Sequence, residues 1–324
     1  MNHTPTPAPP GLPSQGEPSG RARRRRGLHR FALLTVGATF LLLIAGALVT
    51  SNDAGLAVPD WPLSYGTWMP PMVGNIVYEH GHRLVATFVG LLTTILALWL
   101  FWKEPRRWVR RLGLGALLTV VAQGILGGIT VLFLLPRPVS IAHASLAQIF
   151  FCLTVTLAVV TGPAWMTPAT RRDDPERPAL FHLSAAATAV VFLQLILGAA
   201  YRHNALGIVP HLLGATAVIF FGTWLTQRLR RGYNQEATLR RPGQVLVVLV
   251  PVQVLLGAAA YFARLAAAEA AQPGLALVLL TVAHVVVGAA ILGACLVLTL
   301  HARRLLVPAP RALSLSPVSN KVSA

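Results

Sequence analysis

The chain has 324 residues, of which 55% are hydrophobic and only 11% are charged. A water-soluble domain carries about 25% charged residues, so this composition excludes an ordinary soluble fold and indicates that lipid is the solvent. The net charge of +17 would suit nucleic acid, but we expect no nucleic-acid partner, because the positions of the basic residues explain the charge in another way.

Residues 1–30 precede the first apolar run and combine a Pro-, Gly- and Ser-rich stretch with a cluster of arginines. This composition predicts a disordered tail, which the charge pattern described below places in the cytoplasm. A cleavable signal peptide is not expected, since the first apolar run begins late and lacks a small-residue cleavage site.

Eight apolar runs follow, each about 20 residues long and therefore long enough to span a bilayer as a helix. We predict an all-α membrane protein with eight transmembrane helices, near 31–50, 76–102, 112–135, 139–162, 180–201, 205–227, 244–263 and 274–300.

Lys and Arg residues are concentrated in every second connection between these runs. Of the 27, 23 lie on the side that also holds both termini, and the other side has only Arg83, Arg137, Arg202 and Arg264. Because basic loops of membrane proteins stay in the cytoplasm, we expect a multi-pass protein of the plasma (inner) membrane with both termini cytoplasmic.

An internal repeat divides the chain into similar halves. The pattern Gln-x-x-Leu-Gly-small begins at Gln123, Gln194 and Gln253, and a degenerate copy without the Gln spans Leu42 to Ala47. The small residues either let helices pack closely or leave room for a bulky planar ligand, and both interpretations stay open.

The repeat predicts two pseudo-symmetric four-helix bundles, one in each half of the chain. The expected boundaries are a disordered tail at 1–30, a first half at 31–165, a cytoplasmic linker at 166–180, a second half at 181–302 and a cytoplasmic tail at 303–324.

The even-numbered predicted helices each carry one histidine near their start, at equivalent positions of the repeat: His82, His143, His211 and His284. A metal-binding side chain inside a bilayer is costly and normally has a partner in the bundle interior. Two facing imidazoles suit the iron of a haem, whereas the second pair lacks the thiolates or carboxylates of a zinc site. We therefore predict one haem site in each half.

Two further histidines, His80 and His203, lie on the same side of the membrane but outside the register of the repeat. For these two, the expected role is that of a solvated residue at the membrane interface.

The first half also contains Glu79-His80-Gly81-His82-Arg83 at the start of its second helix. Glu79 and His82 are three residues apart and lie on one helix face. A carboxylate beside a haem ligand can act as a base or stabilise a developing positive charge. The alternative role for Glu79 is an ion pair with Arg83, four residues further on.

The Glu-x-x-His-Arg pattern, together with the four repeat histidines and the outer loop from Ala54 to Gly66, resembles the haem A synthase family. The resemblance covers nearly the whole predicted core of eight helices. One departure concerns the first outer loop, where many relatives have a cysteine pair and residues 51–77 have none. A thiol–disulfide route through this loop is therefore in doubt.

The resemblance implies an oxidoreductase that converts the methyl group on ring D of haem O to a formyl group, making haem A for terminal oxidases. It implies that His82 and His143 ligate the iron of the substrate haem, and that His211 and His284 ligate a haem b cofactor. The partners it implies, besides haem O, are haem O synthase (protohaem farnesyltransferase), membrane lipid and a second copy of the chain as a homo-oligomer.

By the same resemblance, Glu79 is the catalytic residue that assists chemistry at the methyl carbon. Arg83 is either a partner of a haem propionate or a partner in an ion pair.

Two other functions remain as alternatives. A di-haem cytochrome b-type membrane electron-transfer protein would use the same histidines without altering haem, although Glu79 and the difference between the halves argue against it. A haem-handling transporter predicts broken helices near the membrane midplane, and Pro251 is the one hint of such a break.

Overall fold

The computed structural model describes residues 20–308, which fold almost entirely into helices. Eight of the helices in this range are long and apolar enough to cross a membrane, by length and composition. The elements are α1 (Gly20–Ser51), α2 (Ile76–Lys103), α3 (Arg107–Leu132), α4 (Arg137–Thr161), the short α5 (Pro163–Met166), β1 (Arg172–Asp174), α6 (Leu180–Arg202), α7 (Ile208–Gly232), α8 (Ala237–Ala266), α9 (Leu275–Leu305) and β2 (Leu306–Pro308). The predicted all-α membrane fold with eight spans is confirmed.

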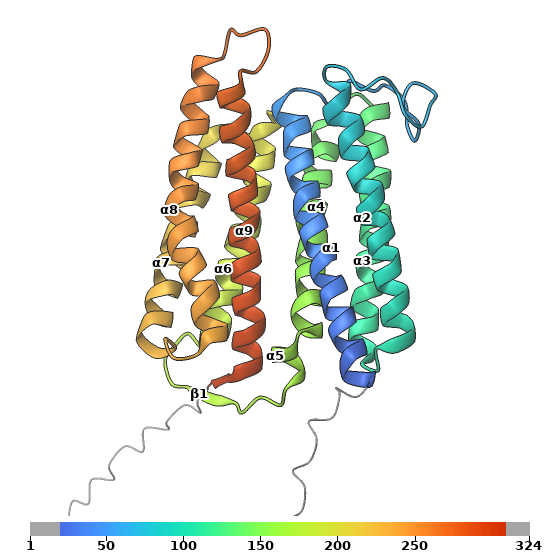
Figure 1. Cartoon of the computed structure of the whole chain (residues 1–324). Coiled ribbons are helices and arrows are strands. Elements are labelled where there is room, and N and C mark those ends of the chain that lie inside the picture. Colours follow the sequence, from blue (N-terminus) through green and yellow to red (C-terminus); the bar gives the residue numbers. More distant parts are fainter. Residues whose placement is uncertain (1–19, 309–324) are drawn as a thin grey trace, which may run out of the picture.

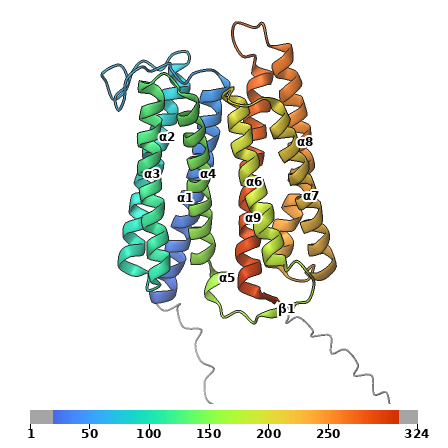
Figure 2. The same ribbon diagram turned by 180° about the vertical axis from the view of Figure 1, so that it is seen from behind.

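The long helices form two bundles that stand side by side (Figure 1). In the first bundle α1 packs on α2 and α4, and α3 packs on α2 and α4; in the second α6 packs on α7 and α9, and α8 packs on α7 and α9. The bundles meet where α9 contacts α1 and α4 and where α4 contacts α6, a boundary that Figure 2 shows from behind.

The two ends of the molecule differ in chemistry. We call the end at which α1 begins and α9 ends the basic end, and the opposite end, near the repeat histidines, the histidine end. At the histidine end, residues 52–75 form a long loop between α1 and α2, whereas residues 203–207 make the corresponding short connection between α6 and α7. The helices α8 and α9 extend beyond the others at this end (Figure 1).

Each bundle has its own core. The buried residues of the first include Leu96, Leu100 and Phe150, and those of the second include Leu183 and Leu298. Since lipid is as apolar as these side chains, close packing rather than escape from water holds such helices together.

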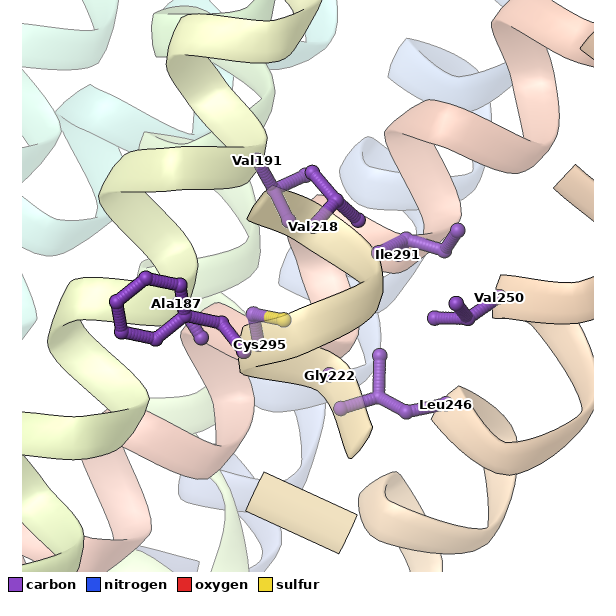
Figure 3. A pocket seen from close by; sticks show the side chains of 9 residues that line it. Ala187, Val191, Val218, Gly222, Leu246, Val250, Ile291 and Cys295 are labelled. Atoms are coloured by element: carbon purple, nitrogen blue, oxygen red, sulfur yellow. The ribbon is translucent and has the colours of Figure 1, made fainter. Parts of the chain in front are cut away.

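A small apolar cavity of about 10 Å³ interrupts the core of the second half (Figure 3). Its walls come from α6, α7, α8 and α9, with Val191, Val218, Val250, Ile291 and Cys295 among the side chains that line it. A cavity of this size is at the lower limit for one water molecule and offers it few polar partners, so it is a packing gap.

The predicted tail at 1–30 overlaps the first helix, because α1 already begins at Gly20. Leu28 packs in the core of the first half, and His29 Nδ1 lies 3.1 Å from the carbonyl oxygen of Ala158. The start of the first apolar run set the predicted end of the tail, but polarity alone does not fix the residue at which a helix begins. Residues 1–19 lie outside the described range.

The predicted boundary at 302/303 falls within the last turn of α9. The helix α9 continues to Leu305, and residues 306–308 form β2, which pairs in parallel with β1 of the linker, Arg172 opposite Leu306. The expected linker thus contains a strand and, at Pro163–Met166, follows a helical turn. Short parallel pairing between distant segments leaves no local periodicity from which to predict it. Residues 309–324 are outside the described range.

A buried ion pair ties the linker to α7. Arg228 Nη2 lies 2.7 Å from Asp174 Oδ1, and the two side chains are 5% and 1% exposed. Tyr233 donates its hydroxyl to the same carboxylate at 2.8 Å, and burial together with this bond raises the pKa of Tyr233 to about 12. The phenol therefore stays a donor at neutral pH.

Candidate functional site: four histidines at one end of the bundles

Each repeat histidine lies against the glycine of a repeat copy on the preceding long helix. If a Cβ atom were added to each of these glycines, it would lie close to the Cε1 atom of the histidine. The distances would be 3.2 Å for Gly46–His82, 3.2 Å for Gly127–His143, 3.0 Å for Gly198–His211 and 2.8 Å for Gly257–His284. Interiors are close-packed, so a side chain at these positions would displace the ring. The repeat glycines therefore make space for the imidazole rings. This role differs from both roles considered from the sequence, which were close helix packing and room for a planar ligand.

The repeat glutamines contact the same histidines. Gln123 Nε2 donates to the carbonyl oxygen of His143 at 2.9 Å, and Gln194 makes the same bond to His211, also at 2.9 Å. In the third copy, the Nε2 atom of Gln253 lies 3.4 Å from the ring Nε2 of His284. The Gln and the Gly of one copy thus position one histidine on the next long helix.

All four histidines keep a ring nitrogen that the protein does not use. The Nδ1 atoms of His82, His143, His211 and His284 are buried without a hydrogen-bond partner among residues 20–308. Buried polar atoms are normally paired, so four unpartnered nitrogens at equivalent positions favour a ligand from outside the chain.

The two histidines of the second half are spaced to share one metal atom. Their ring centres are 6.1 Å apart and their planes are inclined at 71°. An iron atom held between two imidazoles by bonds of about 2 Å sets the ring centres roughly 6.4 Å apart. The donor set and spacing of His211 and His284 therefore fit a haem iron. In the first half, His82 and His143 pack against Gly46 and Gly127 in the same way as the second-half pair packs against its glycines.

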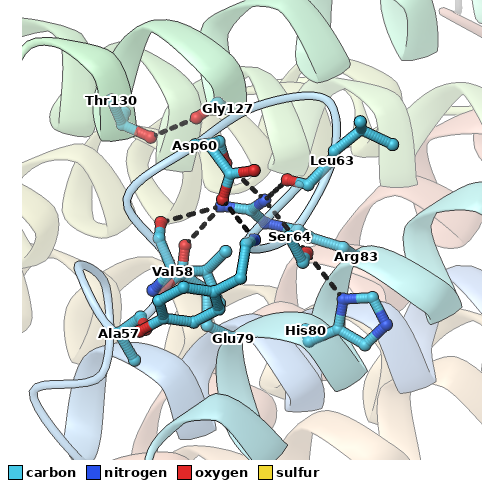
Figure 4. Close-up of polar contacts among 11 residues, drawn as sticks. Ala57, Val58, Asp60, Leu63, Ser64, Glu79, His80, Arg83, Gly127 and Thr130 are labelled. Carbon is cyan, nitrogen blue, oxygen red and sulfur yellow. Dashed lines mark hydrogen bonds and ion pairs between the residues drawn. The ribbon is translucent and has the colours of Figure 1, made fainter. Parts of the chain in front are cut away.

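Glu79 is buried at the start of α2, where each of its carboxylate oxygens accepts a hydrogen bond (Figure 4). Its Oε1 lies 2.7 Å from Arg83 Nη2, and its Oε2 accepts the backbone N–H of Val58 at 2.7 Å. The Glu79 side chain is only 5% exposed. Glu79 thus joins α2 to the loop 52–75, and the ion pair considered for it is present.

Arg83 holds the same loop through its backbone. The guanidinium donates to the carbonyl oxygens of Asp60, Leu63 and Val58 at 2.7, 2.8 and 3.2 Å (Figure 4). Of the two roles considered for Arg83, the ion-pair role is the one that these contacts support, because its donors are taken up by Glu79 and the loop.

His80 is not the solvated residue that its position outside the repeat suggested. Its exposed fraction is 4%, and its Nδ1 lies 2.8 Å from Ser64 Oγ of the loop. The loop folds back over the start of α2 and covers this ring, an effect of tertiary structure that the register of a repeat cannot reveal. Its Nε2 is buried without a partner in the described part of the chain.

The loop also reaches α3 at the copy of the repeat that seats His143. A Cβ atom on Gly128 would come within 2.6 Å of the Trp61 ring, so the indole lies directly on the helix backbone. The backbone N–H groups of Gly66 and Tyr65 hold the pKa of the Asp60 carboxyl below its usual value and fix the turn after Trp61. Part of the loop 52–75 therefore packs on α2 and α3 at the histidine end of the first half.

Sequence reasoning missed the surroundings of His211. Tyr201 stacks on this ring with centres 6.4 Å apart and planes at 12°, and the guanidinium of Arg264 lies 5.5 Å from the Tyr201 ring centre. Arg202 binds the backbone oxygen of Thr50 and, at 3.2 Å, the Asp53 carboxylate, which links the two halves. The signal in the sequence was the position of Tyr201, three residues after the repeat glycine Gly198.

A family model described as "Cytochrome oxidase assembly protein" matches residues 12–77 and 73–210. This region includes the whole first half, the linker and α6, and therefore also Glu79, His82 and His143.

Several proteins named heme A synthase are similar to this chain. That of Symbiobacterium thermophilum is 30% identical over 183 residues, covering 55% of this chain and 60% of the relative. That of Halalkalibacterium halodurans is 33% identical over 159 residues, with coverages of 48% and 50%. That of Geobacillus thermodenitrificans is 25% identical over 272 residues, with coverages of 74% and 84%. In the first two, the chain thus spans about half or slightly more of the relative's length.

Proposed function

Because this chain belongs to the cytochrome oxidase assembly protein family, we propose that it oxidises the ring D methyl group of haem O to a formyl group and so makes haem A. The observation that carries the proposal is the set of four histidines, each seated on a repeat glycine and each with an unpartnered buried nitrogen. The relatives named heme A synthase support the same reaction.

The second half would hold the resident cofactor, haem b, between His211 and His284. Their ring spacing of 6.1 Å suits one iron, and Gly198 and Gly257 keep both rings in place. When bound, haem b supplies a group that takes up and releases single electrons.

The first half would hold the substrate haem on His82 and His143. Support comes from the features that the second half lacks: a carboxylate next to a repeat histidine and a long loop packed over the site. The loop 52–75 contacts α2 and α3 near these histidines. A segment that displaces water from a site strengthens the electrostatic interactions within that site.

Glu79 would act on the substrate from its place on α2. Converting a methyl group to a formyl group removes electrons and protons and adds an oxygen atom, so a proton acceptor and a negative charge near the carbon both favour the reaction. Each Glu79 oxygen accepts one hydrogen bond, from Val58 N–H or from Arg83, and keeps a further lone pair. Arg83 and the Val58 N–H would hold the carboxylate in a fixed orientation.

The rival function, a di-haem cytochrome b-type electron-transfer protein, draws on the same histidine pair of the second half. That function gives no role to the Glu79 carboxylate or to the packing of the loop 52–75 on the first half. Haems extracted from cells that make haem O separate the two functions, because only the synthase yields a formyl product.

The central test is Glu79→Gln, which keeps the size of the side chain and removes its charge. We expect the variant to bind haem yet to accumulate haem O or a hydroxylated product in a strain that lacks its own synthase, because binding and turnover depend on different groups. Haems O, B and A are quantified after extraction.

Glu269→Gln is the matched control, since Glu269 is an exposed carboxylate at the same end of the second half. Haem A at the wild-type level in Glu79→Gln would reduce Glu79 to an ion-pair partner of Arg83. A wild-type chain that forms no haem A from haem O would overturn the proposed function itself.

We also propose that the protein lies in the plasma membrane with the basic end in the cytoplasm, because 23 of 27 basic residues belong to that side. Haem O synthase would supply the substrate, since that reaction makes the compound consumed here. A second copy of the chain remains a proposed partner.

A further inference from the structure

A second cavity, of about 480 Å³, lies at the basic end, at the opposite end of the helices from the four repeat histidines. Its wall comes from three separate parts of the chain: residues 164–172 after α4, residues 233–239 between the end of α7 and the start of α8, and residues 301–306 from the last turns of α9 into β2. Ligand sites in proteins usually have volumes of roughly 300–1,000 Å³, so this cavity is large enough for a small polar group.

The polar lining of this cavity is rich in donors. Arg172 and Arg304 both line it, together with Thr170. Arg304 donates to the Thr167 carbonyl oxygen, while its Nε is buried without a partner among the described residues. The Arg304 guanidinium also lies 4.9 Å from the ring centre of Trp165, which fixes the side chain in place.

Acidic groups do not balance these donors. Among the described residues that line the cavity, Glu236 is the one with a carboxylate, and it already accepts the hydroxyl of Thr238 at 2.7 Å. His301 also lines the cavity, and the Tyr233 hydroxyl is bound to Asp174. The start of α8 adds backbone N–H groups that point out of the helix, with the positive end of its dipole.

The remaining wall is apolar and lies where the membrane span ends. Leu239, Leu305 and Leu306 contribute to it, and Leu305 is the last residue of α9. Headgroups of lipids lie at this depth, and basic pockets between helices at the cytoplasmic side of a membrane suit anionic headgroups.

We propose that this cavity binds a phosphate group through Arg172 and Arg304. The two sources of that chemistry are the headgroup of an anionic phospholipid and free phosphate. Guanidinium groups bind phosphate oxygens through charge-assisted hydrogen bonds, which are about twice as strong as neutral ones. The apolar wall of leucines fits the lipid source.

The test uses the full chain purified in detergent, with its melting temperature measured during titration. The probes are inorganic phosphate, short-chain phosphatidylglycerol and, as a neutral comparison, short-chain phosphatidylcholine. We expect phosphatidylglycerol to stabilise the wild type and phosphatidylcholine to have no effect. In Arg304→Gln and Arg172→Gln, the apparent affinity for phosphatidylglycerol should fall about tenfold or more, since each loses a charge-assisted bond.

Arg303→Gln is the matched control: it neighbours Arg304, lies over the Phe181 ring at 5.9 Å and does not line the cavity. The exposed Arg172 keeps the test valid if Arg304→Gln unfolds. Stabilisation by inorganic phosphate, lost in the same variants, would support the site with a free phosphate as ligand. No stabilisation of the wild type by either anion, or equal losses in Arg303→Gln, would overturn the proposal.

Discussion

The rings of the four repeat histidines pack against the backbone of the four repeat glycines. Gly257 is the tightest case, since a Cβ there would meet His284 Cε1 at 2.8 Å, and the other three repeat glycines differ from it by at most a few tenths of an ångström. In a close-packed bundle such a contact fixes the orientation of a ring, and a metal ligand depends on that orientation.

Removing either second-half imidazole should remove haem. His211→Leu and His284→Leu each leave one ligand of the pair whose ring centres are 6.1 Å apart. We expect a lower haem content per chain and a changed absorption spectrum of the purified protein, because leucine fills the volume but offers no donor. Full haem content with unchanged spectra in both variants would show that this pair does not bind the iron.

Adding a side chain at a repeat glycine should also lower the haem content, although the histidine itself is unchanged. Gly257→Ala places a methyl group 2.8 Å from the His284 ring, and overpacking of this kind costs about 1–3 kcal/mol. We expect the ring to move and the haem content to fall, as measured by absorbance per chain. Gly124→Ala is the control, because a Cβ at Gly124 has nothing within 4 Å. Equal haem contents in the two variants would contradict the role of the glycine seat.

At the scale of elements, two connecting segments do more than join helices. The loop 52–75 is bonded to α2 by Glu79, His80 and Arg83, and the linker after α4 is bonded to α7 through Asp174. Both depend on a buried charged group whose partner lies in another element, so a single substitution can release either segment.

Loss of Arg228 should destabilise the basic end strongly. It would leave the buried Asp174 carboxylate without its cationic partner, and breaking a buried pair in this way costs about 3–5 kcal/mol. We expect Arg228→Ala to lower the melting temperature in detergent, while Arg230→Ala, exposed on the same helix, leaves it nearly unchanged. Similar melting temperatures for both variants would show that the linker is held by other contacts.

On the scale of the whole molecule, duplication gives two bundles and the connections make them unequal. Each bundle has two histidines packed against repeat glycines. The long loop 52–75 packs on the first bundle, whereas residues 203–207 make only a short connection in the second bundle. This difference between the halves is consistent with the proposed division, in which the first half carries the chemistry and the second half transfers electrons.

The orientation in the membrane can be tested directly. Reporter fusions should place residues 51–77 outside and residues 228–242 inside, because the basic loops stay in the cytoplasm. Activity of an external reporter at 228–242 would reverse the topology and move the histidine end to the cytoplasmic side.

The sequence by itself determined the eight spans, the duplication and the four repeat histidines. These features depend on the length and polarity of local segments and on spacing along the chain, which the order of residues contains directly. The resemblance carried by Glu79 to Arg83 then led to the family that the comparison confirms for residues 12–210.

Only the tertiary structure decided which groups meet. The seats of His211 and His284, the burial of His80 and the bonds of Arg83 to the loop all join residues that are distant in sequence or lie in different elements. The start of α1 at Gly20, the pairing of β1 with β2 and the donor-rich cavity at the basic end have the same origin. Contacts of this kind depend on how helices pack and how loops fold back over them, and no local pattern of polarity specifies either.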